Sequence, residues 1–219
     1  MKKSIFAVIA VFFMLAFYSC KKEVTLSFSG DIMLDLGSSD QDVLKFVSAS
    51  DGSSVSVSGI DYNLVGEQIA TFTTEEVSET KSVKIKADKL AGLYEISVFS
   101  LDGNEEDELT VGEGWLITLT KGSKYNQIHI PDSIDKGLRI FINPGKLVVN
   151  FNGKDSAYIP SYIGEFLFTF ESNADYSFSN ITYKKIANNQ YAITGFILKE
   201  SPDSGYEYYY RIELDKKDN

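Results

Sequence analysis

The chain has few residues that could act as nucleophiles, general bases or metal ligands. It contains one histidine, His129, and one cysteine, Cys20, and it has no Gly-x-Ser-x-Gly segment. A zinc site needs several nitrogen, sulfur or carboxylate ligands together, and a serine or cysteine nucleophile needs a base within hydrogen-bond reach. His129 alternates with Ile128 and Ile130, which predicts a solvent-facing position in a strand. The sequence therefore predicts no catalytic residue, no metal ligand and no cofactor.

Carboxylates are abundant, with 31 Asp and Glu against 21 Lys and Arg. Two carboxyl groups across a cleft can hydrolyse a glycosidic bond, so a carboxylate-based glycoside hydrolase is the alternative hypothesis for function. Acidic residues such as Glu95 and Glu213 alternate with apolar residues, which is typical of solvent-facing positions. The acidic run at 102–108 could bind calcium, but its spacing is not that of an EF-hand, and a solvated hairpin tip is the favoured interpretation.

Tyrosine is the most suggestive residue type, with 13 in the chain. In the segment 206–211, Tyr206, Tyr208 and Tyr210 share one face of a strand. Exposed tyrosines beside polar side chains can stack on the apolar faces of sugars, whereas a cross-strand aromatic ladder would cover the core. The residues predicted to contact a glycan or an envelope protein are Trp115, Tyr158, Tyr162, Tyr206 and Tyr208.

The N-terminus has the layout of an export signal. Lys2 and Lys3 precede an apolar run at 5–18, which is too short to span a bilayer, and Ser19-Cys20 follows. Ser19-Cys20 and the charged segment 21–23 resemble the lipoproteins of the Bacteroidota, although Phe17 stands where a lipobox prefers Leu. The resemblance implies a signal peptide at 1–19, lipidation of Cys20, a short tether at 20–23, and an outer-membrane lipoprotein displayed on the cell surface.

Charge and cysteine content limit the possible partners. Removing residues 1–19 removes two lysines and no acid, so the net charge falls from −10 to −12. Such a surface disfavours nucleic acid and anionic lipid, which leaves the acyl chains as the membrane contact. Cys20 is the single cysteine, so no disulfide can form within the chain.

The pattern of short alternating segments predicts an all-β protein. In the first half, strands are expected at 24–28, 43–48, 55–58, 69–73, 83–86, 93–101 and 116–120. The segments 55–59, 65–66, 92–98 and 102–104 resemble the later strands of bacterial extracellular Ig-like domains, in which a Gly-x-Tyr strand precedes an Asp-Gly-Asn hairpin. This resemblance implies an Ig-like β-sandwich at 24–121.

The second half is expected to be a separate antiparallel β-sandwich or open barrel at 122–219. Its expected strands are 138–142, 146–151, 165–170, 176–186, 190–199 and 206–214. The tripeptides that begin at Asp132 and Asp155 resemble O-glycosylation acceptors of exported Bacteroidota proteins, which implies possible modification at Ser133 and Ser156.

These features together predict a non-enzymatic, lipid-anchored envelope protein. The Ig-like module would be a spacer, and the C-terminal module would bind a glycan or a partner protein. Besides the glycoside hydrolase, a structural or assembly subunit of a surface appendage remains an alternative, which predicts an exposed sheet edge and self-association.

Overall fold

The computed structural model describes residues 23–101, 108–130, 148–153, 157–160, 162–164, 174–186, 190–202 and 205–217. These residues form three β-sheets with one short α-helix and two 3₁₀ turns, which confirms the all-β prediction. The predicted signal peptide, Cys20, Ser133, Ser156, residues 102–107 of the acidic run, and the expected strands 138–142 and 165–170 lie outside the described residues.

The described residues from 23 to 90 form two small sheets. One pairs β1 with β3, and the other has the order β2-β6-β5-β4, with β2 parallel to β6 and the other pairs antiparallel. Phe28 of β1 packs edge-on against Phe72 of β5, which joins the two sheets through an apolar layer. The elements are β1 (Leu26–Phe28), β2 (Ile32–Asp35), α2 (Asp40–Val43), η1 (Leu44–Phe46), β3 (Val47–Ala49), β4 (Ser56–Ser58), β5 (Gly66–Thr73), β6 (Ser78–Lys86) and η2 (Asp88–Leu90).

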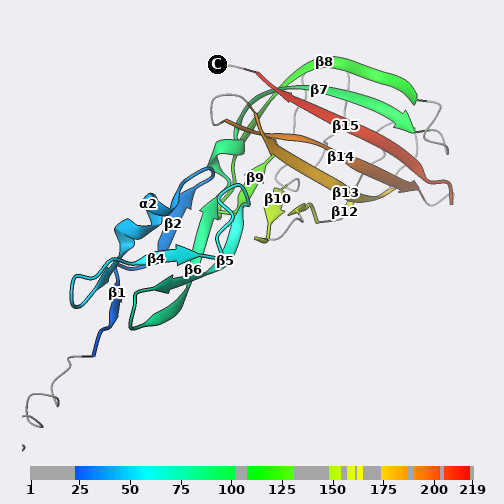
Figure 1. Cartoon of the computed structure of the whole chain (residues 1–219). Helices are drawn as coiled ribbons and strands as arrows, with labels where there is room; N and C mark the ends of the chain where they lie inside the picture. Colours follow the sequence, from blue (N-terminus) through cyan, green and yellow to red (C-terminus); the bar gives the residue numbers. More distant parts are fainter. Residues whose placement is uncertain are drawn as a thin grey trace, which may run out of the picture.

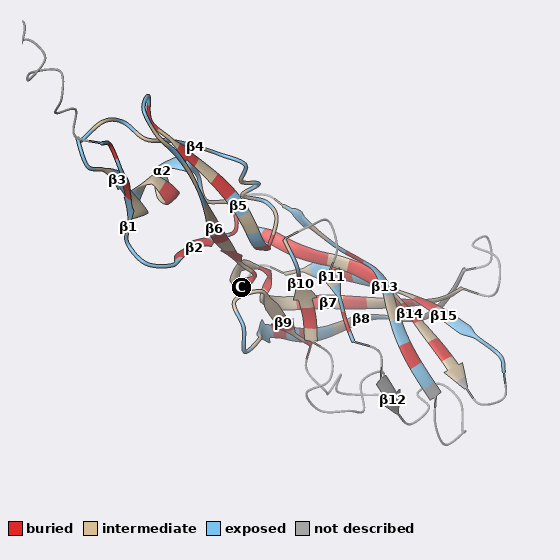
Figure 2. Ribbon diagram, turned by 90° about the horizontal axis from the view of Figure 1, so that it is seen from below, coloured by how far each residue is buried: buried red, intermediate tan, exposed pale blue. Residues whose placement is uncertain are grey.

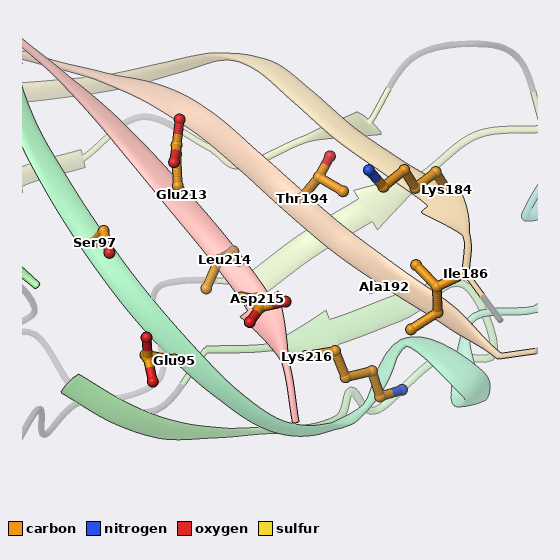
Figure 3. Close-up of a pocket in the computed structure, with 10 residues that line it drawn as sticks. All are labelled: Glu95, Ser97, Lys184, Ile186, Ala192, Thr194, Glu213, Leu214, Asp215 and Lys216. Atoms are coloured by element: carbon orange, nitrogen blue, oxygen red, sulfur yellow. The ribbon is translucent and has the colours of Figure 1, made fainter. Parts of the chain in front are cut away.

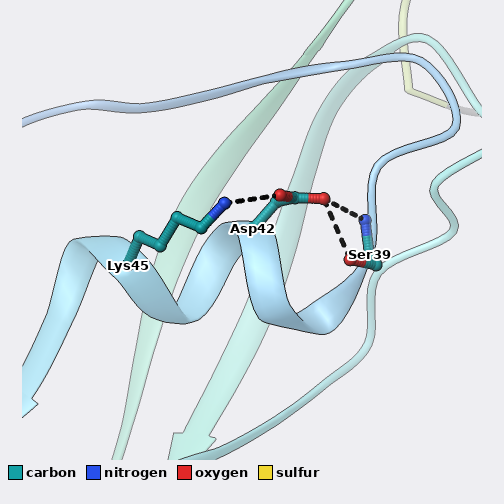
Figure 4. Close-up of polar contacts among 3 residues, drawn as sticks. All are labelled: Ser39, Asp42 and Lys45. Atoms are coloured by element: carbon teal, nitrogen blue, oxygen red, sulfur yellow. Dashed lines mark hydrogen bonds and ion pairs between the residues drawn. The ribbon is translucent and has the colours of Figure 1, made fainter.

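Helix α2 lies within a stretch where the sequence suggested only strands. Asp42 accepts hydrogen bonds from the backbone N–H and the hydroxyl of Ser39, and it forms an ion pair with Lys45 at 2.9 Å (Figure 4). The Lys45 ammonium, followed by the Ser39 groups, holds the pKa of Asp42 below its usual value. This cap stabilises a helical turn at 40–43, so the strand expected at 43–48 is reduced to β3.

The remaining strands form one antiparallel sheet of nine strands, in the order β11-β10-β9-β8-β7-β15-β14-β13-β12. The sheet curls, as Figure 1 shows, so that β11 contacts β13 near the opposite edge. It is therefore an open barrel. Its strands are β7 (Gly92–Leu101), β8 (Glu108–Lys121), β9 (Gln127–His129), β10 (Val148–Phe151), β11 (Ala157–Tyr158), β12 (Tyr162–Gly164), β13 (Ala174–Lys185), β14 (Tyr191–Pro202) and β15 (Tyr208–Lys216).

The change from the small sheets to the large one differs from the expected domain boundary. β7 pairs with the C-terminal strand β15 along eight residues, and β8 pairs with β9 through Thr120 and Lys121. The sheets therefore change at 87–91, and residues 122–126 connect β8 and β9 of the nine-stranded sheet. The partner of β7 is more than a hundred residues away in the chain, so no local pattern reveals this pairing.

Buried residues recur along the strands of the large sheet, where Figure 2 colours them red, and their alternation with less buried residues gives the sheet one buried face. In β15, Tyr210, Ile212 and Leu214 are buried, whereas Glu213 between them and Asp215 after them are exposed. The same face of β7, β8 and β14 carries further buried side chains. The most deeply buried of these include Tyr94, Ile96, Val98, Leu119, Tyr191 and Ile193.

Close backbone contact joins the small sheets to the large one. The carbonyl of Val65 accepts a hydrogen bond from Gly153 N–H at 3.0 Å, and Val65 N–H donates to the Tyr183 hydroxyl at 2.8 Å. The Tyr191 hydroxyl donates to the Asn63 side chain. A Cβ atom on Gly66, whose φ is 125°, would overlap the backbone of Gly153. Glycine is required here both by conformation and by space.

Two side chains fix the 3₁₀ turn η2, where the chain passes between the sheets. The Tyr94 hydroxyl donates to Leu90 O at 2.6 Å and accepts from Ile193 N–H at 3.3 Å. The Lys216 ammonium donates to Lys89 O and Tyr191 O, at 2.7 and 3.0 Å. Burial raises the pKa of Tyr94 to about 12, and burial lowers the pKa of Lys216. We call this region, together with the contacts around Gly66, the junction.

Candidate binding surface at the distal end of the large sheet

A row of tyrosines and one glutamate crosses four adjacent strands of the large sheet. In the register, Tyr162 of β12 lies opposite Tyr176 of β13, Tyr176 opposite Glu200 of β14, and Glu200 opposite Tyr208 of β15. Residues directly opposite in antiparallel strands share a face. The row is built by pairing of strands that are distant in sequence, so its members meet only in the folded sheet.

Among the described residues, Glu200 is the one charged residue that is fully buried, with an exposed fraction of 0%. The Tyr176 hydroxyl donates to its Oε1 at 2.7 Å, and the Tyr210 hydroxyl lies 3.5 Å from its Oε2. Burial, followed by the charge of Glu200, raises the pKa of Tyr210. A buried carboxylate needs hydrogen-bond donors to compensate for lost hydration, and the two phenols supply them.

Exposure increases along β15 toward its start. Tyr210 is buried, Tyr208 is 39% exposed, and Tyr206, just before the strand, is 71% exposed. The buried tyrosines and Glu200 thus form a polar base, and Tyr208 and Tyr206 form an exposed aromatic rim beside it. We call Tyr206 and Tyr208 the distal rim.

A polar network lies on the opposite face of the same strand ends. Glu207 forms an ion pair with Lys199 and accepts a hydrogen bond from the Tyr209 hydroxyl at 2.7 Å. The Lys199 hydrogen bond is the main reason that the pKa of Glu207 lies below its usual value, and Glu207 raises the pKa of both Lys199 and Tyr209. This network holds the backbone beside the distal rim in place without covering Tyr206 or Tyr208.

The structure brings together only some of the predicted contact residues. Tyr206 and Tyr208 are both exposed where β15 begins, and Tyr162 is in register with the row. Tyr158 is exposed on β11, a strand at the other edge of the hydrogen-bonded order. Trp115 lies opposite Ile96 and packs against the core, so its position is that of a core aromatic.

Glu200 is a buried residue of this surface that residue types alone do not reveal. A usable signal was present, because Glu200 continues the alternation of the buried residues Phe196 and Leu198. An acid in phase with apolar positions predicts a buried carboxylate that needs donors. The interruption of the alternation at Gly195 conceals that phase in the sequence.

His129 is half-buried in β9 rather than turned fully to solvent, while Ile128 and Ile130 are buried. Within the described part of the chain, no group of three or more His, Cys, Asp or Glu side chains could hold a metal ion. In the same residues, no helix has the length and apolar content needed to cross a bilayer.

Comparison with known proteins finds no matching family model, no matching curated protein and no matching solved structure. Function is therefore inferred from the chemistry and position of the surface itself.

Proposed function

We propose that the chain is a non-enzymatic, lipid-anchored protein of the bacterial cell envelope that binds a glycan through the distal rim of its large sheet. The N-terminal region that carries the two small sheets is a spacer, and the acyl chains on Cys20 attach the protein to the outer membrane at the cell surface. The proposal combines the chemistry of Tyr206 and Tyr208 with their place in the molecule.

The observation that carries the proposal is the position of the rim relative to the start of the fold. β1 lies at one end of the elongated molecule, and the ends of β14 and β15 that carry the rim lie at the other (Figure 1). Five residues separate the predicted lipidation site, Cys20, from the start of β1. An anchor at Cys20 would therefore leave the rim pointing away from the membrane.

The chemistry of the rim supports a sugar as ligand. Tyr206 and Tyr208 offer exposed rings with a polar hydroxyl at the tip, which suits a ligand with apolar ring faces and many hydroxyl groups. Tyr208 adjoins the buried row of Tyr176 and Glu200, whose packing limits the rotamers of neighbouring side chains. A preorganised aromatic surface loses less conformational entropy when it binds.

The glycoside hydrolase alternative needs a carboxyl group held neutral near physiological pH by an apolar site. On the outer face of the large sheet, Lys217 lies 3.1 Å from Glu95 and 2.7 Å from Asp215, and Arg211 lies 3.1 Å from Glu213. All three of these carboxylates form ion pairs with a cation, which supports binding rather than hydrolysis. Release of new reducing ends from a bound polysaccharide would contradict the non-enzymatic part of the proposal.

Membrane attachment is tested by a Cys20→Ala variant. Wild-type protein is expected to partition into detergent with Cys20 at its mature N-terminus, whereas the variant is expected to be uncleaved or soluble in the periplasm. The reason is that each buried acyl methylene contributes about 0.8 kcal/mol, so two or three chains make attachment effectively permanent. Wild-type protein in the aqueous phase with a different N-terminus would contradict the anchor.

Glycan binding is tested by applying detergent-solubilised full-length protein to an array of bacterial and plant glycans. The expected result is binding to a subset of glycans, with loss of signal for Tyr208→Ala. Tyr158→Ala is the matched control, because Tyr158 is also exposed, at 54%, but lies away from the rim. Equal loss for both variants would contradict the assignment to the rim.

A further inference from the structure

A second feature lies on the outer face of the large sheet, opposite the core. Two adjoining concavities, of about 260 and about 250 Å³, share Thr194 and Glu213 in their walls. Together they form one groove that crosses β13, β14, β15 and β7. In β15 the groove uses the face of Arg211, Glu213 and Asp215, whereas the core uses the alternate positions.

An irregularity in β13 and β14 lies beneath this groove. The register between the two strands shifts between Ser179 and Tyr183, and Asn180 there has a φ of 52°, the one positive φ among the described non-glycine residues. On β14, a Cβ atom on Gly195 would overlap the carbonyl oxygen of Ile212. Bulges of this kind bend a strand and redirect side chains, and they are frequent beside functional sites.

Hydroxyl groups and charged side chains line the groove, so it offers both hydrogen-bond donors and hydrogen-bond acceptors. Thr194 shares a 2.7 Å hydrogen bond with Thr182 of the neighbouring strand. Figure 3 shows Lys184 beside Thr194, with Ser97 and Glu213 on the adjacent strands. Lysine donates, carboxylate accepts and hydroxyl does both, so the groove can satisfy a ligand that carries many hydroxyl groups.

The charges of the groove balance, although the chain as a whole has a net charge of −10. Three acids and three cations lie together here, namely Glu95, Glu213 and Asp215 with Lys184, Arg211 and Lys217. Lys217 pairs with both Glu95 and Asp215, and Arg211 pairs with Glu213. An anionic ligand would meet the carboxylates, and a cationic one would meet Lys184 and Arg211. The balance favours an uncharged ligand.

The groove lacks the features of a protein interface. Such interfaces have an apolar centre rich in aromatic residues. The large exposed hydrophobic side chains of the described residues all lie outside the two concavities. These side chains are Met33, Ile69, Leu116, Tyr158, Tyr206 and Tyr208.

We propose that this outer-face groove binds a segment of an uncharged oligosaccharide, with Thr194, Glu213 and Lys184 contacting its hydroxyl groups. The inference deepens the proposed function, on which its choice of a sugar rests, and it assigns a neutral glycan. It also places a second contact on the same module, on the face opposite the core and separate from the distal rim.

Affinity electrophoresis of the detergent-solubilised full-length protein tests the inference. The gels contain starch, α-mannan, xylan or β-glucan as neutral probes, and polygalacturonate as an anionic probe. We expect a neutral polysaccharide to retard the wild-type protein, and the double variant Thr194→Val, Glu213→Gln to lose at least about tenfold in affinity, since two hydrogen bonds are removed. The matched control is the double variant Thr118→Val, Glu113→Gln, which changes two exposed residues of β8. It is expected to bind like the wild-type protein.

The variants also separate this inference from the proposed function. A loss of affinity for the neutral polysaccharide in the groove variant supports the groove as a binding site. This holds whether or not the rim double variant Tyr206→Ala, Tyr208→Ala also loses affinity. Loss only in the rim variant overturns the groove and leaves the proposed function standing. Retardation by polygalacturonate alone, or no retardation by any neutral probe, overturns the neutral-glycan inference. Unfolding temperatures within a few degrees of wild type show that the groove variant is folded.

Discussion

The junction and the distal rim use the same residue type for opposite purposes. At the junction, the hydroxyls of Tyr94, Tyr183 and Tyr191 all form hydrogen bonds that join separate sheets or turns. At the rim, Tyr206 and Tyr208 expose their rings. The difference shows that tyrosine content alone does not identify a binding surface, and that exposure and hydrogen-bond partners must be known.

The largest effect on stability is expected from Gly66→Ala at the junction. The new Cβ atom would overlap Gly153 and would also occupy a φ of 125°, so we expect a loss of about 4 kcal/mol in the free energy of unfolding. Urea unfolding measures this change. Gly52→Ala is the control, because Gly52 also has a positive φ, of 78°, but has nothing within 4 Å of the added atom.

The control separates conformational strain from steric overlap. Gly52→Ala is expected to cost about 1 kcal/mol. Equal losses in the two variants would show that the contact between Gly66 and Gly153 does not hold the sheets together.

Tyr94→Phe is expected to have a smaller effect, of about 2 kcal/mol at neutral pH, because Leu90 O and Ile193 N–H lose a partner. The variant also tests a pH dependence. Tyr94 is protonated up to a pKa of about 12 in the folded state, against about 10 in an unfolded chain. Its contribution is complete below pH 10 and is lost as the pH rises from about 10 to about 12.

The wild-type protein should therefore lose stability more steeply than Tyr94→Phe across that alkaline range. Lys216 acts in the opposite sense at lower pH, because its folded pKa is lowered and its burial becomes less costly as the ammonium loses its proton. Denaturant unfolding at a series of pH values measures both slopes. Parallel curves for wild type and Tyr94→Phe would contradict the role given to the Tyr94 hydroxyl.

Local patterns predicted much of the fold. The alternation in 176–186, 190–199 and 206–214 corresponds to β13, β14 and β15, with ends that differ by a few residues. Side-chain alternation is a local property, so it can be recognised in the sequence without knowing which strands pair with one another.

What local patterns could not supply is pairing between distant strands. The eight-residue match of β7 with β15 moved β7 and β8 into the large sheet, and the same kind of pairing assembled Tyr176, Glu200 and Tyr208. The helix α2 was missed because its capping residues, Ser39 and Asp42, precede an apolar stretch that is too short to show a helical period.

The distal rim should contribute least to stability. Tyr206 and Tyr208 are exposed, so the double variant Tyr206→Ala, Tyr208→Ala is expected to change the free energy of unfolding by no more than about 0.5 kcal/mol. Its effect on binding should be large, because truncation of an aromatic anchor in a binding surface commonly costs about 2 kcal/mol or more.

Calorimetric titration of this double variant with a glycan that binds the wild-type protein, together with its urea unfolding curve, tests the central claim most directly. The account predicts unfolding like wild type and an affinity reduced by at least about tenfold. Undiminished affinity in the folded variant would contradict the claim that the distal rim is the glycan-binding surface.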